Sequence, residues 1–368
     1  MKKYIYLPIS LFIILMGCNQ NNNQSQIILK TSGFADSTKI YLDNSLTQIT
    51  DSGYIINNNL VFSVELNEPT RFTIRPIYKR GMPYDVKTFW KEDKQIIINA
   101  LTGKLETALV EGSEIQKQLD IIDAAKAPLK LLNDSLLMEY RKLPREDTEK
   151  RLVLRTQRRE MTKAILDVEV DYVNNNHDEV FSVITLKNLM SYSIPKDKTK
   201  ELYENLSAQM KSTKYGLNIK KYLDLSTDFK IGDQAKDFQL PDLEGHLFGL
   251  SSFKGKYILL DFWSANCGPC LMEIPVLLRN YETYKEKGFE ILSVSLDKKR
   301  EDWENTVNKE NMIWTTVGDL EGLDGDIPMT YSVYYMPTYY LIDPNGIIID
   351  KILGRGQLDE KLEKLFTN

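Results

Sequence analysis

Cys267-Gly268-Pro269-Cys270 follows directly on an apolar run, Tyr257 to Trp263, and precedes a stretch with helical character. Two cysteines separated by two residues at a strand-to-helix junction form the arrangement that a dithiol/disulfide switch needs. The unpaired N–H groups and the positive dipole end of a helix N-terminus stabilise a thiolate there. Because a thiolate, and not a thiol, attacks disulfides, this stretch predicts a redox-active pair.

The third cysteine, Cys18, ends an N-terminal segment that has the features of a signal peptide. Lys2 and Lys3 come first, a mostly apolar run reaches Leu15, and the ending Gly17-Cys18 resembles the bacterial lipobox, whose cysteine is lipidated. The run is shorter than the roughly 20 residues of a membrane-spanning helix, although an uncleaved anchor is the alternative. We predict a signal peptide over residues 1–18, a tether over 19–26 and a lipid on Cys18.

Export would place the remaining cysteine pair outside the cytoplasm, where disulfides form and must be managed. Removing the signal segment from the 368 residues leaves about 350, enough for two or three domains. The net charge of −5 becomes −7 when the two lysines of the signal leave, and both signs are interspersed. This balance offers no basic footprint for nucleic acid, and we predict neither a nucleic-acid partner nor a cofactor.

Residues 27–112 favour a small β-sandwich or barrel, because short β-rich segments alternate with turn residues and show no helical period. The predicted strands are Ile27–Lys30, Lys39–Leu42, Leu60–Leu66, Arg71–Ile77, Val86–Trp90 and Gln95–Ile98. The predicted turns are Ser52-Gly53, Asn57 to Asn59 and Gly81 to Pro83.

Residues 113–228 are rich in Leu, Lys, Glu and Arg, with apolar residues at three- and four-residue spacing, which predicts a helical region. Arg141 to Pro144 and Ser193 to Pro195 are the predicted breaks between helices. From residue 229 onward strands and helices alternate, which predicts a parallel strand–helix–strand unit followed by an antiparallel pair at the Asn345-Gly346 turn. The predicted elements are a Phe238–Leu240 and Leu247–Leu250 hairpin, strands Tyr257–Trp263, Phe289–Leu296, Thr338–Ile342 and Ile347–Leu353, and helices Pro269–Lys287, Arg300–Lys309 and Leu358–Phe366.

With these elements in order, residues 229–368 resemble the thioredoxin-fold domain of TlpA/ResA-type thiol-disulfide oxidoreductases. Four stretches carry the resemblance: the entry segment Ile231 to Phe238, the link Leu250 to Lys256, the loop Phe262 to Cys270 with Glu273-Ile274-Pro275 after it, and Met336-Pro337-Thr338. Asn266 departs from the aromatic residue usual in that loop. The preceding residues resemble, more weakly, a β domain and helical region found before such redoxins in bacterial lipoproteins. The implied fold is a thioredoxin-like α/β domain after a small all-β domain and a helical region.

Cys267 is predicted to be the exposed nucleophile, and Cys270, one turn into the helix, the shielded resolving thiol. The alternative, half of a zinc site, needs two more ligands, and only Cys18, His177 and His246 remain. From its likeness to thioredoxin, Asp261 is implied to be a buried acid/base for the resolving thiol, or else an exposed strand-end residue.

The resemblance also implies that Glu273 tunes the site, although an exposed helix carboxylate is the equal alternative. Pro337 is implied to follow a cis bond that turns the Met336 backbone toward substrate. The predicted site comprises Cys267, Cys270, Asp261 and Glu273 for catalysis, Gly268 and Pro269 in the loop, and Trp263, Met336, Pro337 and Thr338 for substrate binding, with no metal.

The leading hypothesis is a lipid-anchored reductase of disulfides in exported proteins, in the bacterial cell envelope and facing the periplasm, with a membrane electron donor. A peroxidase of the peroxiredoxin class is one alternative, but its motif needs a proline where Leu260 stands, although Ser264 fits. A binding lipoprotein with an accessory redox domain is the other. The sequence leaves the direction of electron flow open, because redox poise depends on the stability of both forms.

Overall fold

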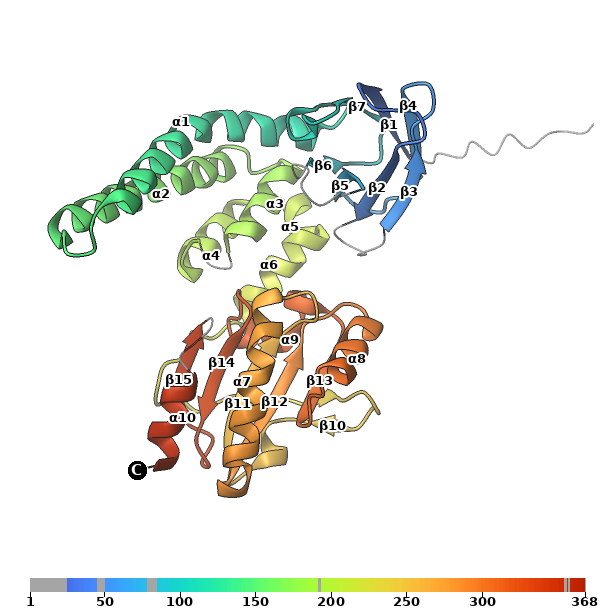
Figure 1. The fold of residues 1–368 in the computed structure, drawn as a ribbon. Helices are drawn as coiled ribbons and strands as arrows, with labels where there is room; N and C mark the ends of the chain where they lie inside the picture. Colours follow the sequence, from blue (N-terminus) through green and yellow to red (C-terminus); the bar gives the residue numbers. More distant parts are fainter. Residues whose placement is uncertain are drawn as a thin grey trace, which may run out of the picture. The chain divides into compact units, whose positions relative to one another are not determined.

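The computed structural model describes residues 25–44, 50–77, 85–190, 193–353, 356 and 358–367. The predicted signal peptide, including Cys18, lies outside the described residues. The chain forms two compact units, Met1–Lys117 and Gln118–Asn368 (Figure 1). Within the described ranges, no helix is both long enough and apolar enough to cross a membrane.

The first unit is a sandwich of two four-stranded sheets. One sheet has the order β4 (Asn59–Val64), β1 (Ser25–Ser32), β7 (Ile96–Leu101) and β8 (Leu109–Glu111), and the other has β3 (Thr50–Tyr54), β2 (Lys39–Asn44), β5 (Thr70–Pro76) and β6 (Lys87–Lys91). Alternate residues of β1 are buried, so that Ile27 and Leu29 enter a core with Phe72 and Phe89 of the second sheet. The short helix η1 (Leu105–Thr107) precedes β8. The predicted small all-β domain is confirmed.

The prediction of a turn at Ser52-Gly53 is wrong. Both residues lie inside β3, where Ser52 pairs with Tyr41 and Gly53 pairs with Ile40 of β2. A Cβ atom at Gly53 would come within 2.5 Å of the Leu60 side chain, so the glycine serves close packing in a strand instead of a turn. The predicted Asn57-Asn58 turn is confirmed by positive φ angles of 50° and 61°.

The second unit begins with helices, as predicted from the three- and four-residue spacing. They are α1 (Glu114–Lys142), α2 (Thr148–Asn175), α3 (Val180–Leu189), α4 (Lys196–Asn205), α5 (Ala208–Ser212) and α6 (Lys214–Leu225). The apolar faces of α2 to α6 share one core, which includes Val183, Leu202 and Ile219. Met329 of the following domain is buried in the same core, so the helices and that domain pack as one unit.

The C-terminal domain is a five-stranded mixed sheet flanked by helices, which confirms the predicted thioredoxin-like architecture (Figure 1). The sheet order is β13 (Thr315–Gly318), β12 (Phe289–Ser295), β11 (Tyr257–Trp263), β14 (Thr338–Ile342) and β15 (Ile348–Leu353). The remaining elements are β9 (Leu240–Pro241), β10 (Leu247–Phe248), η2 (Leu250–Phe253), α7 (Gly268–Tyr284), η3 (Lys285–Lys287), α8 (Arg300–Lys309), η4 (Gly322–Asp324), α9 (Asp326–Thr330) and α10 (Leu358–Thr367).

The central strand β11 is buried on both faces, as expected for a strand that pairs with β12 in parallel and with β14 antiparallel. Leu260 and Phe262 enter the core on one face, and Leu259 and Trp263 enter the core on the other. α7 covers this second face with Cys270, Ile274 and Leu277. The strand alternation therefore points Asp261 toward the same side as α7.

Candidate active site

The two cysteines form a disulfide at the N-terminus of α7. Cys267 is the N-cap of the helix, and the Cys270 backbone N–H donates to its Sγ across 3.2 Å. Cys270 is 3% exposed, whereas Cys267 is half-buried. Pro269 lies in the first helical turn, where its missing N–H costs no helical hydrogen bond. The two sulfurs are thus unequal in access, and the helix N-terminus faces the accessible one.

The loop before the disulfide is anchored by a buried aspartate that the sequence analysis missed. Asp297 is 2% exposed, and its Oδ1 accepts hydrogen bonds from the Ser264 hydroxyl at 2.7 Å and from the Ala265 N–H at 3.0 Å. The Ser295 hydroxyl donates to its Oδ2 at 2.9 Å. The Cys267 N–H in turn donates to the Ser264 carbonyl at 3.0 Å. Asp297 therefore fixes the loop that presents Cys267.

Asp261 is 1% exposed, which confirms the predicted burial. The strand register places it between Ser293 of β12 and Tyr339 of β14. Burial raises the pKa of its carboxyl to about 7; the hydrogen bond from Ser293 lowers it, and the nearby Glu273 charge raises it. An acid with this pKa exchanges a proton near neutral pH.

A chain of hydrogen bonds fixes which carboxylate oxygen can take that proton. The Trp314 indole N–H, which can only donate, donates to the Ser293 hydroxyl oxygen at 2.8 Å. Ser293 then donates its own proton to Asp261 Oδ2 at 2.6 Å. Asp261 Oδ1 is buried and has no hydrogen-bond partner among the described residues. A proton that reaches Asp261 therefore belongs on Oδ1.

Glu273 is 5% exposed and lies in α7, one helical turn after Cys270. Its burial contradicts the alternative of an exposed helix carboxylate. Its charge raises the pKa of Asp261, so the two acids interact electrostatically beneath the helix.

The loop between α9 and β14 brings a second group of predicted residues to the disulfide. The Met336–Pro337 peptide bond is cis, and Met336 packs against the cluster that contains both cysteines. Thr338 is fully buried, and its hydroxyl donates to the Tyr335 carbonyl at 2.8 Å. Thr338 therefore shapes the loop from within.

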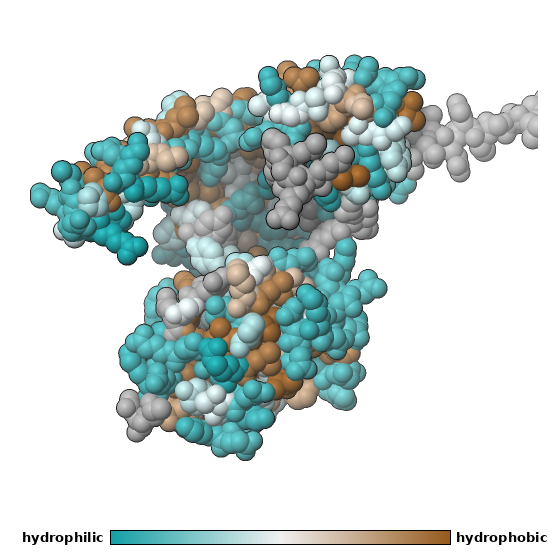
Figure 2. All heavy atoms as spheres, viewed as in Figure 1, coloured by the Kyte–Doolittle hydropathy of each residue, from teal (hydrophilic) through white to brown (hydrophobic). Residues whose placement is uncertain are grey.

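Trp263 is 2% exposed and packs in the same cluster as Cys270, so its burial leaves little surface for a substrate. Gly268 and Pro269 are exposed beside the disulfide. A Cβ atom on Gly268 would meet no described atom within 4 Å, so packing inside the protein does not require glycine there. Figure 2 shows apolar side chains gathered on the C-terminal domain in the region of α7, and Met272 of this helix is 56% exposed.

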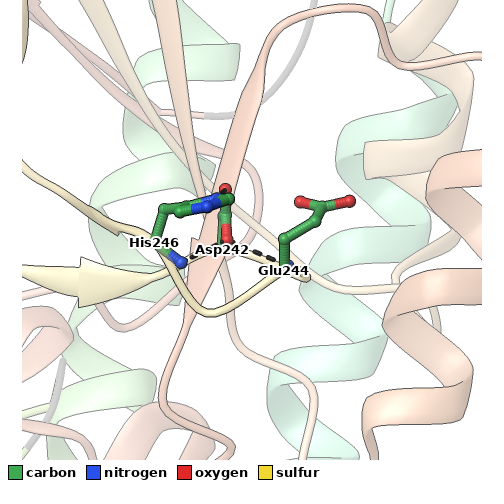
Figure 3. A group of neighbouring side chains, drawn as sticks. All are labelled: Asp242, Glu244 and His246. Atoms are coloured by element: carbon green, nitrogen blue, oxygen red, sulfur yellow. Dashed lines mark hydrogen bonds and ion pairs between the residues drawn. The ribbon is translucent and has the colours of Figure 1, made fainter.

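A second cluster of polar groups lies in the β9–β10 hairpin, away from the cysteines in sequence (Figure 3). Asp242 Oδ1 accepts the backbone N–H groups of Glu244 and His246 at 2.9 and 2.8 Å, and Oδ2 lies 3.3 Å from His246 Nδ1. These bonds hold the hairpin turn. Glu244 and His246 are exposed. His246 therefore lies in the turn of the predicted hairpin, where its contacts with Asp242 stabilise the turn.

Comparisons with known proteins cover the domain that holds this site. The profile of the AhpC/TSA family matches residues 231–351. The thiol-disulfide oxidoreductase ResA of Bacillus cereus is 36% identical over 147 residues, which are 39% of this chain and 83% of that protein. ResA of Oceanobacillus iheyensis is 34% identical over 135 residues, which are 36% of this chain and 69% of that protein.

The chain belongs to the ResA-like thiol-disulfide oxidoreductases. Among solved structures, the thioredoxin domain of a thiol-disulfide oxidoreductase from Bacteroides vulgatus is 36% identical and matches 38% of this chain and 99% of that chain, with a TM-score of 0.36. A thiol-disulfide oxidoreductase from Bacteroides fragilis is 33% identical and matches 36% of this chain and all of that chain, with a TM-score of 0.35. The resemblance to this family and the predicted enzyme class are confirmed, and the C-terminal domain is called the ResA-like domain below.

The sequence contains a weak signal for Asp297 and Ser293, which were not among the predicted site residues. Asp297 follows directly on an apolar strand, and Ser293 lies within that strand. Polar residues at the carboxyl ends of neighbouring parallel strands meet at one edge of a sheet, so Asp297 and the residues after β11 could have been paired. Trp314 gave no such signal, because its contact with Ser293 depends on the position of β13.

Proposed function

We propose that the protein reduces disulfides of exported proteins through Cys267 and Cys270. The observation that carries the proposal is the inequality of the two sulfurs, one half-buried at a helix N-terminus and the other buried behind it. A half-buried sulfur can meet a polypeptide, and a buried one can react only within the chain. The exposed apolar surface in the region of α7 suits an unfolded or partly folded polypeptide (Figure 2).

The reaction takes two exchanges. The Cys267 thiolate attacks one sulfur of the substrate disulfide, forming a mixed disulfide and releasing the other substrate sulfur as a thiolate, which takes up a proton. The Cys270 thiolate then attacks Cys267 Sγ, which forms the intramolecular disulfide and releases the second substrate thiolate. The substrate gains two electrons and two protons, and the protein is left oxidised. A reductant in the membrane, the proposed electron donor, restores the dithiol.

Asp261 is the proposed acceptor of the Cys270 proton. Its carboxyl lies on the side of β11 that α7 covers, and its Oδ1 is open to a proton. Glu273 shares this buried region, and its charge holds the Asp261 pKa up, so that Asp261 remains a usable base near pH 7. The Met336 backbone, beside the cis bond, is the proposed pairing site for an extended substrate segment.

The inequality of the sulfurs is tested by labelling the reduced protein. One equivalent of iodoacetamide at mildly acidic pH should modify Cys267 in preference to Cys270, because only Cys267 is accessible and faces the helix N-terminus. Peptide mapping locates the label, and reduction of insulin disulfides is measured on the same sample. Labelling of Cys267 should abolish reduction. Equal labelling of both cysteines, or full activity with Cys267 blocked, would contradict the proposal.

We also propose that Cys18 carries a lipid that holds the protein on the cell envelope, facing the periplasm. The proposal is supported by the lipobox-like ending at Cys18. Cys18→Ser should release the protein to the soluble fraction, since a lipid is its proposed anchor. Fractionation of cells expressing each form measures this. Membrane association that persists in the variant would point to an uncleaved helix or a membrane partner.

A further inference from the structure

A cavity of about 300 Å³ lies in the second unit, beside the cis-proline loop. It is lined by the start of α4, the end of α6 and the segment after it, the loop before β14, and β15. We call it the lysine pocket; its lining residues are Ile194, Pro195, Lys196, Tyr222, Ser226, Asp228, Ser332, Tyr334, Tyr335, Thr338, Lys351 and Leu353.

The two lysines give the pocket its charge. Lys351 is half-buried on the edge strand β15, with its ammonium 4.9 Å from the centre of the Tyr340 ring, and no carboxylate of the described residues forms an ion pair with it. Lys196 donates to the Ser226 carbonyl at 2.7 Å. The one lining acid, Asp228, forms an ion pair with Lys230. Burial lowers the pKa of Lys351, and the Asp228 charge raises it, so Asp228 also acts on this ammonium group. An anion in the pocket would therefore meet two ammonium groups and compete with this one acid.

Hydroxyl groups add hydrogen-bond donors. Ser226 is buried, and its Oγ has no hydrogen-bond partner among the described residues. The Tyr334 hydroxyl donates to the Tyr222 hydroxyl at 3.2 Å, which leaves the Tyr222 proton available to an acceptor. Ammonium and hydroxyl donors together suit a carboxylate, which can accept several hydrogen bonds.

The pocket adjoins the place where the substrate chain is proposed to pair. Tyr335 and Thr338 line it from the two sides of the cis Met336–Pro337 bond. Tyr335 is 48% exposed and Leu353 is 50% exposed, so the rim is open and partly apolar. An extended chain advances about 3.3 Å per residue, so a residue close in sequence to the reacting cysteine can reach a neighbouring pocket.

The helices hold their half of the pocket firmly against the ResA-like domain. Lys221 of α6 forms ion pairs with Glu321 at 3.2 Å and Asp326 at 2.6 Å. Lys187 of α3 pairs with Asp324 at 3.0 Å, and Tyr334 packs against the helical core. The pocket is thus a joint feature of the helical region and the redox domain.

We propose that the lysine pocket binds an acidic side chain of the substrate polypeptide, within a few residues of its reacting cysteine. The proposal rests on the proposed reductase function and names the substrate class that it favours. It also gives the helical region a part in choosing substrates.

The test uses peptides that carry one cysteine as a mixed disulfide with thionitrobenzoate. The Cys267 thiolate attacks the peptide sulfur, the peptide becomes bound to Cys267, and thionitrobenzoate leaves with the electron pair and is read by its absorbance. A set of peptides places Glu, Gln or Lys at each position from one to five residues on either side of the cysteine. At the preferred position, Glu should react about threefold to tenfold faster than Gln, and Lys more slowly, as for a partly exposed charge pair.

The variants Lys351→Met and Lys196→Met should each reduce the Glu preference, and both together should remove it, whereas Lys351→Arg should retain it. Lys285→Met, an exposed lysine at the end of α7, is the matched control and should keep the full preference. Salt at 0.5 M, a concentration chosen to screen exposed charges, should reduce the preference. Rates are divided by the rate with a small neutral disulfide, which corrects for general loss of reactivity.

Equal rates for the three peptides at every position would overturn the proposal, as would a Glu preference that survives the double lysine variant. Failure of every peptide and of the small disulfide to react with reduced protein would instead refute the reductase function, and the pocket proposal with it.

Discussion

Cys270→Ala protein should accumulate mixed disulfides with its substrates. Cys267 is half-buried at the start of α7 and can still attack, but the thiol that resolves the adduct is gone. Cys270 is 3% exposed, and the disulfide of the oxidised chain shows that its sulfur comes within bonding distance of Cys267 Sγ, so resolution requires no approach from solvent. Adducts that are transient in the native protein should therefore become the main form of the variant in envelope extracts.

Gels run without reductant, with thiols blocked at lysis, measure these adducts. The matched control is Cys267→Ala, which keeps one thiol but leaves only the buried Cys270. This control should form few or no adducts, and circular dichroism should show both variants folded. A folded Cys270→Ala protein that forms no adducts removes the main support for the oxidoreductase mechanism. Equal adducts in both variants would reverse the roles of the cysteines.

Much of the ResA-like domain could be predicted because its local signals are strong. β11 is an apolar run, the Cys267 to Cys270 motif marks a helix start, and Asn345-Gly346 marks the turn between β14 and β15. The sequence predicts no element between residues 309 and 338, where the structure has β13 and α9. β13 has only four residues and takes its place from its pairing with β12, which is a long-range property.

The supporting residues of the site were harder to predict for the same reason. Ser293 meets Asp261 only because the parallel register aligns β11 with β12, and Asp297 meets Ser264 only at the end of that pairing. The lysine pocket is a more distant case, since Lys196 and Lys351 are far apart in sequence and neither has a motif. Chemistry that is local in sequence was predictable, and chemistry assembled by tertiary contacts was not.

Asp261→Asn should slow resolution of the mixed disulfide while stabilising the fold. The change keeps the shape of the side chain and removes the proposed acceptor of the Cys270 proton. General acid–base help of this kind is typically worth about 10²–10⁴-fold. The stability effect has the opposite sign, because the folded protein holds the Asp261 proton up to about pH 7 while the unfolded chain loses it near pH 4.

The raised pKa of Asp261 in the folded chain also makes the stability depend on pH. Between about pH 4 and pH 7 the unfolded state binds fewer protons than the native state at Asp261, so this group lowers stability as the pH rises. Asn cannot ionise, so the stability of Asp261→Asn relative to the native protein should grow across that window, by an amount on the order of 3–4 kcal/mol. Denaturant unfolding of the reduced proteins at pH 4 and pH 8 measures the difference.

The pH dependence of the rate separates a proton acceptor from a structural residue. In the native protein the ionised fraction of Asp261 rises with pH and levels off above about pH 7, the pKa set by burial, Ser293 and Glu273. The variant has only bulk solvent to ionise Cys270, so its rate should continue to rise above pH 7. The ratio of the native rate to the Asp261→Asn rate should therefore be largest and nearly constant below pH 7, and should decrease above it.

Ser293→Ala supplies the matched variant for this rate profile. It removes the hydrogen bond that favours the ionised carboxylate, so the Asp261 pKa should rise and the levelling of the rate should move to higher pH. Stopped-flow release of a fluorescent peptide from its mixed disulfide with Cys267 gives the rate at each pH. If Asp261→Asn resolves the adduct at the native rate from pH 6 to pH 8, Asp261 is a structural residue. A different outcome is that Asp261→Asn lowers the rate while the rate of Ser293→Ala levels off at the same pH as that of the native protein. In that case Asp261 acts by shaping the site and not by taking the proton.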